Sequence, residues 1–206
     1  MTGIIDYDAG NIGSVAKALA YLGEDAEVTR DAGKLLAADR VILPGVGSFG
    51  QAMEKLREYG LVPVIQEIAE RKIPFLGICL GLQLLFESSE ESPGVEGLSL
   101  LPGKILRIPR TEGLKIPHMG WNSLTLQNEG RLFAGMEQDA YVYFVHSYYL
   151  KAEEPFIVKA VTDYGTSIHA SVERENVFAC QFHPEKSGQT GLHILKNFTK
   201  LGRGDF

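Results

Sequence analysis

The sequence contains few of the features that mark a secreted, membrane-spanning or metal-binding protein. It has only two cysteines, Cys79 and Cys180, and neither lies in a CxxC or Cys/His pattern, so no disulfide framework or zinc site is indicated. No segment has the roughly 18 to 20 apolar residues needed to span a bilayer, and the N-terminus lacks the basic start and apolar run of a signal peptide. We therefore expect a cytosolic protein.

Basic residues are also scarce. The 206 residues include 20 Lys and Arg against 26 Asp and Glu, which gives a formal net charge of -6. Proteins that bind nucleic acid through its phosphates need clustered positive charge, so small substrates and protein partners fit this composition better. Apolar residues make up 45% of the chain, enough to bury a real core. We expect one domain over residues 1–206, without linkers or repeats.

Strand and helix patterns alternate in the first half, which predicts parallel βαβ units. The expected strands are 3–6, 26–29, 40–43 and 74–78, and the expected helices are 12–22, 51–71 and 80–86. After residue 88 six strand-like pieces follow, which we expect to add antiparallel strands to the same sheet: 104–108, 122–126, 140–150, 156–162, 167–173 and 177–182. A last helix is expected from an N-cap at Ser187 to Gly202. The fold class is α/β, with a mixed sheet between helices.

Cys79 stands in Gly77-Ile78-Cys79-Leu80-Gly81, where a buried-strand pattern runs directly into a helix pattern. Gly-x-Cys-x-Gly at such a junction is the cysteine form of the nucleophile elbow, in which the glycines leave room for a tight turn. The following helix N-terminus favours the thiolate, and the N–H of Leu80 is one candidate donor to an oxyanion. Cys180 has no such setting, and we assign it to the core.

Among the five histidines, His183 is the best candidate for a general base, because it ends the last strand and is followed by Pro184 and Glu185. Residues two apart in extended backbone project to the same side, so Glu185 can reach and orient the imidazole. The alternative for this pair is a strand-end histidine beside a solvated carboxylate. His169 and His193 are expected on the surface or a helix face, and His118 and His146 at a pocket or interface.

The segment Gly45-Val46-Gly47-Ser48-Phe49-Gly50 matches the Gly-x-Gly-x-x-Gly pattern of dinucleotide-binding loops. The next strand offers no acidic residue for a ribose hydroxyl, and the loop does not open the first βα unit, so nucleotide binding is not favoured. If strands 40–43 and 74–78 are neighbours, this loop lies near Cys79. Its N–H groups can then supply a second oxyanion donor.

These features together resemble the class I, triad-type glutamine amidotransferases. The matching stretches are 44–50, 77–83 and Gln181-Phe182-His183-Pro184-Glu185, and with their order and spacing the resemblance covers essentially the whole chain. It implies a Rossmann-like, three-layer mixed sheet flanked by helices, with antiparallel strands added in the second half. It also implies a catalytic triad of Cys79, His183 and Glu185, with oxyanion contacts near Val46, Gly47 and Leu80.

Three further stretches are similar to the glutaminase subunits of imidazole glycerol phosphate synthases, a group within that class: 5–14, 117–122 and 143–148. By this resemblance one set of residues helps to hold glutamine: Gln83, Glu91, His146, Ser147 and Tyr148. A second set approaches a synthase (cyclase) subunit in a heterodimer: Asn11, Met119, Trp121 and Lys186. Met119 and Trp121 as core residues, and Glu91 and Lys186 as solvated charges, are the alternatives.

The expected chemistry is hydrolysis of glutamine through a Cys79 thioester, with no metal or organic cofactor, and delivery of ammonia to the synthase for histidine biosynthesis. Three other functions stay open at this point: service to a different ammonia-using synthase, a cysteine hydrolase or peptidase on the same elbow, and a catalytically idle regulatory subunit. The intact triad argues against the idle subunit, because a subunit without catalytic activity would have no reason to retain all three residues.

Overall fold

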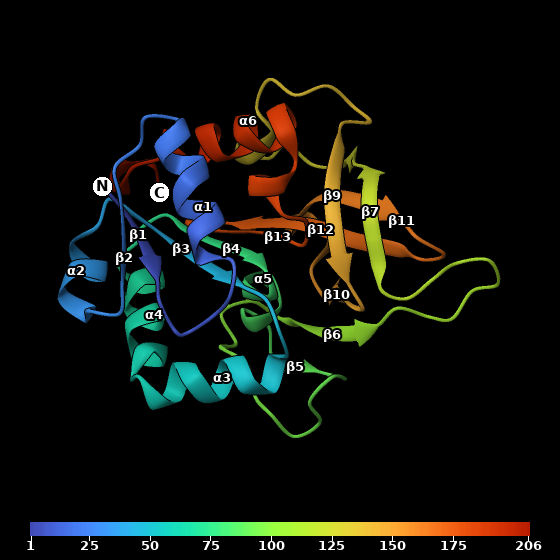
Figure 1. Cartoon of the computed structure of the whole chain (residues 1–206), viewed down its shortest axis with the longest axis horizontal. Helices are drawn as coiled ribbons and strands as arrows, with labels where there is room; N and C mark the ends of the chain where they lie inside the picture. Colours follow the sequence, from blue (N-terminus) through green and yellow to red (C-terminus); the bar gives the residue numbers. More distant parts are fainter.

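The computed structural model describes residues 1–206, in which strands and helices alternate through the first half (Figure 1). The strands are β1 (Thr2–Ile5), β2 (Ala26–Thr29), β3 (Arg40–Gly45), β4 (Phe75–Cys79), β5 (Ser88–Ser89), β6 (Gly103–Arg107), β7 (His118–Ser123), β8 (Thr125–Leu126), β9 (Tyr141–His146), β10 (Tyr148–Ala152), β11 (Val158–Asp163), β12 (Ser167–Arg174) and β13 (Val177–Cys180). The α-helices are α1 (Ile12–Tyr21), α2 (Ala32–Ala37), α3 (Phe49–Glu58), α4 (Leu61–Glu70), α5 (Leu80–Leu84) and α6 (Gly188–Thr199). Short 3-10 helices are η1 (Arg131–Phe133), η2 (Pro155–Ile157), η3 (Pro184–Lys186) and η4 (Arg203–Asp205).

An eight-stranded mixed sheet runs through the molecule in the order β2-β1-β3-β4-β13-β12-β11-β8. The strands from β2 to β13 pair in parallel, and β12, β11 and β8 extend the sheet with antiparallel pairing. The predicted α/β class with a mixed sheet is confirmed. In open sheets of this kind ligands bind beyond the carboxyl ends of the parallel strands. Here β3, β4 and β13 end side by side.

Alternation of side chains along the central strands builds one core on each face of the sheet. In β1, Ile4 and Ile5 pack into different cores, and in β4 Leu76 and Phe75 divide in the same way. One core includes buried residues of α1 and α6, and the other includes residues of α2 to α5. Figure 1 shows α1 and α6 on one side of the sheet and α3 and α4 on the other. The three-layer prediction is therefore confirmed.

The second half of the chain departs from the prediction that every strand joins one sheet. Segment 140–150 breaks at Ser147 into two strands, of which β9 pairs with β7 and β10 pairs with β6. The β7–β9 ribbon stands apart from the main sheet, and β10, β6 and β5 form a third sheet (Figure 1). Alternating residues predict extended backbone, but they do not specify the partner strand, which is set by long-range packing.

The helices also differ in detail from the sequence prediction. Segment 51–71 is two helices, because Gly60 adopts a left-handed φ of 65° between α3 and α4. Helix α2 was not predicted: it has six residues, and its strongest signal is the Asp31 side chain, which accepts a hydrogen bond from the Lys34 N–H at 2.8 Å. Ser187 precedes α6 as predicted, but its hydroxyl donates to the His183 carbonyl oxygen and does not cap the helix. No helix has the length and apolar character of a membrane span.

Candidate active site

Cys79 ends β4 and directly precedes α5, in a backbone conformation with φ 55° and ψ −109°. A positive φ is strained for any residue with a side chain, and strain of this kind concentrates at functional sites. A Cβ added to Gly77 would lie 2.7 Å from the Gly81 carbonyl oxygen, and one added to Gly81 would lie 1.9 Å from the Leu43 carbonyl oxygen. Both glycines of the predicted elbow are therefore required by the close packing of this turn.

The glycine-rich loop after β3 lies beside this cysteine. Gly45 is paired with Cys79 in the parallel register of β3 and β4, which confirms that the two strands are neighbours. Val46 and Gly47 line the same cavity as Cys79, and Gly47 has a left-handed φ of 103°. Residues of this loop and Leu80 consequently border the cavity that contains the sulfur.

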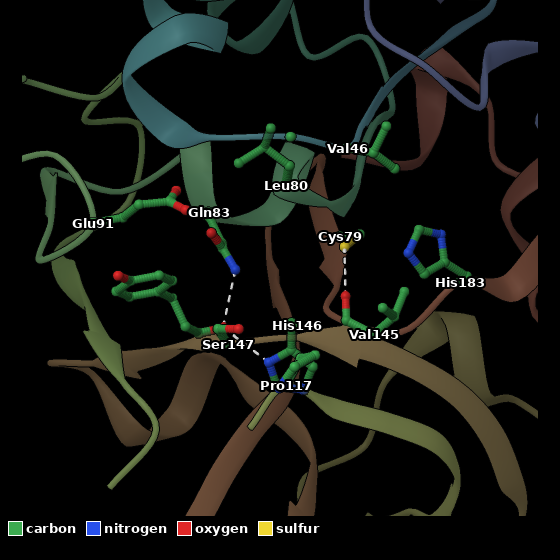
Figure 2. Close-up of a pocket in the computed structure, with 12 residues that line it drawn as sticks. Val46, Cys79, Leu80, Gln83, Glu91, Pro117, Val145, His146, Ser147 and His183 are labelled. Atoms are coloured by element: carbon green, nitrogen blue, oxygen red, sulfur yellow. Dashed lines mark hydrogen bonds between the residues drawn. The ribbon is translucent and has the colours of Figure 1, made fainter. Parts of the chain in front are cut away.

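His183 and Glu185 lie just past β13, with the imidazole beside Cys79 in Figure 2. The His183 Nδ1 donates to Glu185 Oε1 at 2.8 Å, and the two side chains are 1% and 0% exposed. Asn11 Nδ2 donates to the same carboxylate oxygen at 2.5 Å. The predicted reach from Glu185 to His183 is confirmed, and the alternative of a solvated carboxylate is wrong.

The surroundings of His183 favour its charged form. Burial by itself lowers the pKa of the imidazole, but the neighbouring Cys79 sulfur and the Glu185 carboxylate outweigh burial and raise the pKa to about 9. A positive imidazole next to the sulfur stabilises the thiolate, which is the nucleophilic form. Cys180 contrasts with this site, because complete burial raises the pKa of its thiol well above the ordinary value. Its assignment to the core is confirmed by its 0% exposure.

A cavity of about 370 Å³ opens in front of the sulfur, which is within the size range of small-molecule sites. It contains all eight residues predicted to bind the oxyanion or the substrate, together with two residues of the predicted triad, and adds two residues to which the sequence analysis gave no role. The lining consists of Val46, Gly47, Cys79, Leu80, Gln83, Glu91, Pro117, Val145, His146, Ser147, Tyr148 and His183. The two additions are Pro117 and Val145, whose carbonyl oxygen accepts a hydrogen bond from Cys79 Sγ at 3.9 Å (Figure 2).

Two polar side chains of the cavity, Gln83 and Glu91, are held in place by hydrogen bonds. Gln83 is 5% exposed, and its Nε2 donates to the Tyr148 carbonyl oxygen at 3.0 Å and to Gln181 Oε1 at 3.1 Å. Glu91 Oε2 accepts from the Phe49 N–H at 2.7 Å, so a carboxylate distant in sequence caps the N-terminus of α3. The cavity therefore has an amide on one wall and a negative charge at one end.

His118 and His146 form a buried pair at the cavity wall, which His146 helps to line. The His146 Nδ1 donates to the Tyr148 carbonyl oxygen at 2.8 Å, so its Nε2 accepts from His118 Nδ1 at 3.0 Å. The remaining His118 nitrogen accepts from Asn122 Nδ2 at 3.3 Å. His118 also stacks on Tyr164, with ring centroids 4.0 Å apart. Each nitrogen is satisfied only when both rings are neutral, and burial lowers the pKa of His118 to about 4 and of His146 to about 3.

The residues predicted to face a partner are divided by the structure. Met119 and Trp121 are 63% and 55% exposed on the β7–β9 ribbon, so the alternative of core residues is wrong. Met119 pairs in register with Val145, a cavity-lining residue. Lys186 is exposed beside the triad, whereas Asn11 is half-buried against Glu185. The exposed apolar surface therefore adjoins the cavity rim. No group of three or more His, Cys, Asp or Glu side chains has the arrangement of a metal site.

Residues 3–201 match the family "Glutamine amidotransferase class-I". A protein of Moorella thermoacetica named imidazole glycerol phosphate synthase subunit HisH is 53% identical over 200 residues, covering 97% of this chain and 94% of the relative. The protein of the same name from Methanothermobacter thermautotrophicus is 52% identical over 204 residues, covering 98% of this chain and 100% of the relative.

Solved structures support the fold. A structure described as a glutamine amidotransferase superposes with a TM-score of 0.74 at 22% identity, covering 96% of this chain and 98% of the other. The structure of PurLQS from Thermotoga maritima gives a TM-score of 0.75 at 22% identity, covering 97% of both chains. At this level of identity the likeness concerns the fold alone.

Proposed function

Because the chain belongs to the class I glutamine amidotransferase family, we propose that it hydrolyses glutamine to glutamate and ammonia as the glutaminase subunit of an imidazole glycerol phosphate synthase. The observation that carries the proposal is the strained Cys79 elbow at a cavity that also contains His183, itself bonded to Glu185. We further propose that residues 1–206 act as one glutaminase domain.

In the proposed mechanism the imidazole of His183 takes the proton of the Cys79 thiol, and the thiolate attacks the amide carbon of glutamine. Glu185 keeps the imidazole in the tautomer that presents Nε2 to the sulfur and stabilises its positive charge. N–H groups near Val46–Gly47 and of Leu80 receive the oxyanion. His183 then protonates the departing ammonia, and a water molecule deprotonated by the same imidazole hydrolyses the thioester.

The cavity suits glutamine better than a peptide. Its volume of about 370 Å³ fits one amino acid, and a protein substrate needs an open groove through which a chain can continue. We assign Glu91 to the α-amino group, because its carboxylate is the negative charge at the end of the cavity. Gln83, His146, Ser147 and Tyr148 form the wall that holds the rest of the substrate.

We propose that the partner docks on the β7–β9 ribbon and around the cavity rim. Met119, Trp121 and Tyr141 are three large exposed apolar side chains of the two strands, and such side chains are typical anchors of protein interfaces. Ammonia released into neutral water becomes ammonium, which is not nucleophilic, so the synthase must receive it before protonation. Docking over the rim meets this need, with Asn11 and Lys186 at the contact.

The test is glutamate formation by the isolated chain and by the chain mixed with the cyclase subunit and its ligand. We expect low turnover alone and a clear rise in the complex, with Cys79→Ala inactive in both. Trp121→Ala should weaken assembly and abolish the rise, while the basal rate stays near that of the native chain.

Full activity of the isolated chain, together with normal assembly of Trp121→Ala, would contradict the partner-gated function and indicate a free-standing amidase. Hydrolysis of amides or peptides in preference to glutamine would instead support a general cysteine hydrolase.

A further inference from the structure

Gln181 is a buried polar residue that the mechanism above does not use. It follows β13, is 0% exposed, and directs its amide toward the nucleophile: Nε2 lies 3.7 Å from Cys79 Sγ in a donating geometry. The other end of the same amide, Oε1, accepts from Gln83 Nε2 at 3.1 Å. A buried amide with both ends bonded is held in one orientation, because rotation would leave its buried polar groups unpaired.

The orientation of the two amides is set by a main-chain group. The Tyr148 carbonyl oxygen can only accept, so the Gln83 atom that faces it at 3.0 Å must be the N–H donor. The second N–H of that nitrogen then points to Gln181, which must present its oxygen there and its own N–H to the sulfur. The Tyr148 carbonyl oxygen thus fixes the orientation of the Gln83 amide, and the Gln83 amide fixes the orientation of the Gln181 amide that donates to Cys79.

Besides His183, two other polar groups contact the sulfur, and they have opposite preferences. The Val145 carbonyl oxygen accepts from the S–H at 3.9 Å and therefore favours the neutral thiol. The Gln181 N–H can bond a sulfur with or without its proton, and a hydrogen bond to the charged form is the stronger one. Without Gln181, the Val145 carbonyl oxygen, which favours the neutral thiol, would remain at the sulfur without this opposing donor.

We propose that Gln181 is a further catalytic residue, which stabilises the Cys79 thiolate by donating an N–H that Gln83 and the Tyr148 carbonyl hold in place. The inference rests on the proposed function, in which Cys79 is the nucleophile. It assigns to Gln83 a second task, since Gln83 orients the sulfur's donor in addition to lining the substrate cavity.

The experiment measures the rate of Cys79 alkylation by iodoacetamide across pH in the full chain, with peptide mass spectrometry to separate Cys79 from Cys180. Gln181→Met keeps the size of the side chain and removes the donor. We expect the midpoint of the alkylation profile to rise by about half to one pH unit, which corresponds to about 0.7 to 1.4 kcal/mol. Below both midpoints the rate should fall by about three- to tenfold.

Two variants serve as control and as second test. Ser171→Ala removes another fully buried side-chain hydrogen bond, to the Ala179 carbonyl oxygen at 2.8 Å, without contacting Cys79, and should keep the native midpoint. Gln181→Asn keeps an amide but withdraws it from the sulfur by one methylene, so it should also raise the midpoint. This variant tests the inference if Gln181→Met does not fold. A native midpoint in every folded Gln181 variant overturns the inference.

The same measurements distinguish a failure of the proposed function from a failure of the role given to Gln181. If the native chain carries no reactive Cys79, or hydrolyses glutamine after Cys79→Ala, the nucleophile itself is wrong. If Cys79 is alkylated and required while Gln181 variants keep its midpoint, only the role of Gln181 is wrong.

Discussion

The buried pair of His118 and His146 should make this protein sensitive to mild acid. Both rings are neutral in the folded state, because each nitrogen is fixed as a donor or an acceptor by its neighbours. Protonation of either ring would place two donors against each other in a buried site. We predict that His118→Gln, which keeps a donor and an acceptor but cannot titrate, reduces the loss of stability between pH 7 and pH 5.

The magnitude follows from the pKa values. The pKa of His118 is lowered by burial to about 4 in the folded state, against about 6.5 in the unfolded chain. The unfolded state therefore binds more protons below pH 6.5, and stability present above that pH is lost as the pH falls toward 4. Between pH 7 and pH 5 this loss is about 2 kcal/mol for His118.

His183 acts in the opposite direction. Its folded pKa is raised to about 9, so its stabilisation is complete below the unfolded value and is lost as the pH rises through 9. Between pH 7 and pH 5 it changes by only about 1 kcal/mol, and it is common to both proteins being compared.

The assay is urea unfolding followed by circular dichroism at pH 7 and pH 5. The free energy of unfolding of His118→Gln should fall by about 2 kcal/mol less over this interval than that of the native chain. Ile194→Val, a core change on α6, is the control. It should lower the free energy of unfolding relative to the native chain by the same amount at pH 7 and at pH 5, about 0.5 to 1.5 kcal/mol. An unchanged acid loss in His118→Gln would refute the neutral-pair reasoning.

Three other predictions concern the nucleophile and its support. A glutamine-like alkylating analogue should label Cys79 alone, and label on the peptide carrying Cys180 would contradict this. Glu185→Gln should reduce glutamate formation much less than His183→Ala, because the carboxylate orients the ring that moves the protons; equal losses in folded variants would show this division to be wrong. Gly81→Ala, whose added methyl meets a β3 carbonyl oxygen at 1.9 Å, should destabilise the chain by about 1 to 3 kcal/mol in thermal unfolding, and native stability would contradict the packing.

Local signals in the sequence indicated the parallel strands of the first half and two local features of the predicted triad. Cys79 lies at a strand-to-helix junction between two glycines, and Glu185 lies two residues from His183, so both relations are fixed by chain spacing. The neighbourhood of Gly45 and Cys79 followed from the alternation of strands and helices, because consecutive parallel strands usually pair. These features of the fold and the site depend on few contacts between segments that are distant in sequence.

The remaining parts depend on contacts between distant segments. Gln181 and Gln83 are 98 residues apart, and nothing local in either one indicates that their amides meet. The pairing of β7 with β9 could likewise not be predicted. Their apolar and polar residues alternate as in a strand of the main sheet, so the pattern does not identify the partner strand. Asn11 was assigned to a partner surface, while the structure also bonds it to Glu185, 174 positions away. Hydrogen bonds of this kind carry no periodicity, so a pattern of residue types does not reveal them.

Three buried histidines near the cavity show how the fold assigns different charge states to one residue type. His118 and His146 are each other's neighbours and face neutral acceptors and donors, so burial dominates and lowers the pKa of both. His183 is also buried, but it has Glu185 on one nitrogen and Cys79 near the other, and its pKa rises. The difference matters for the proposed mechanism, since a positive ring at the cavity wall would compete with His183 for the thiolate. Neutral rings there leave the imidazole of His183 as the cation that pairs with the sulfur.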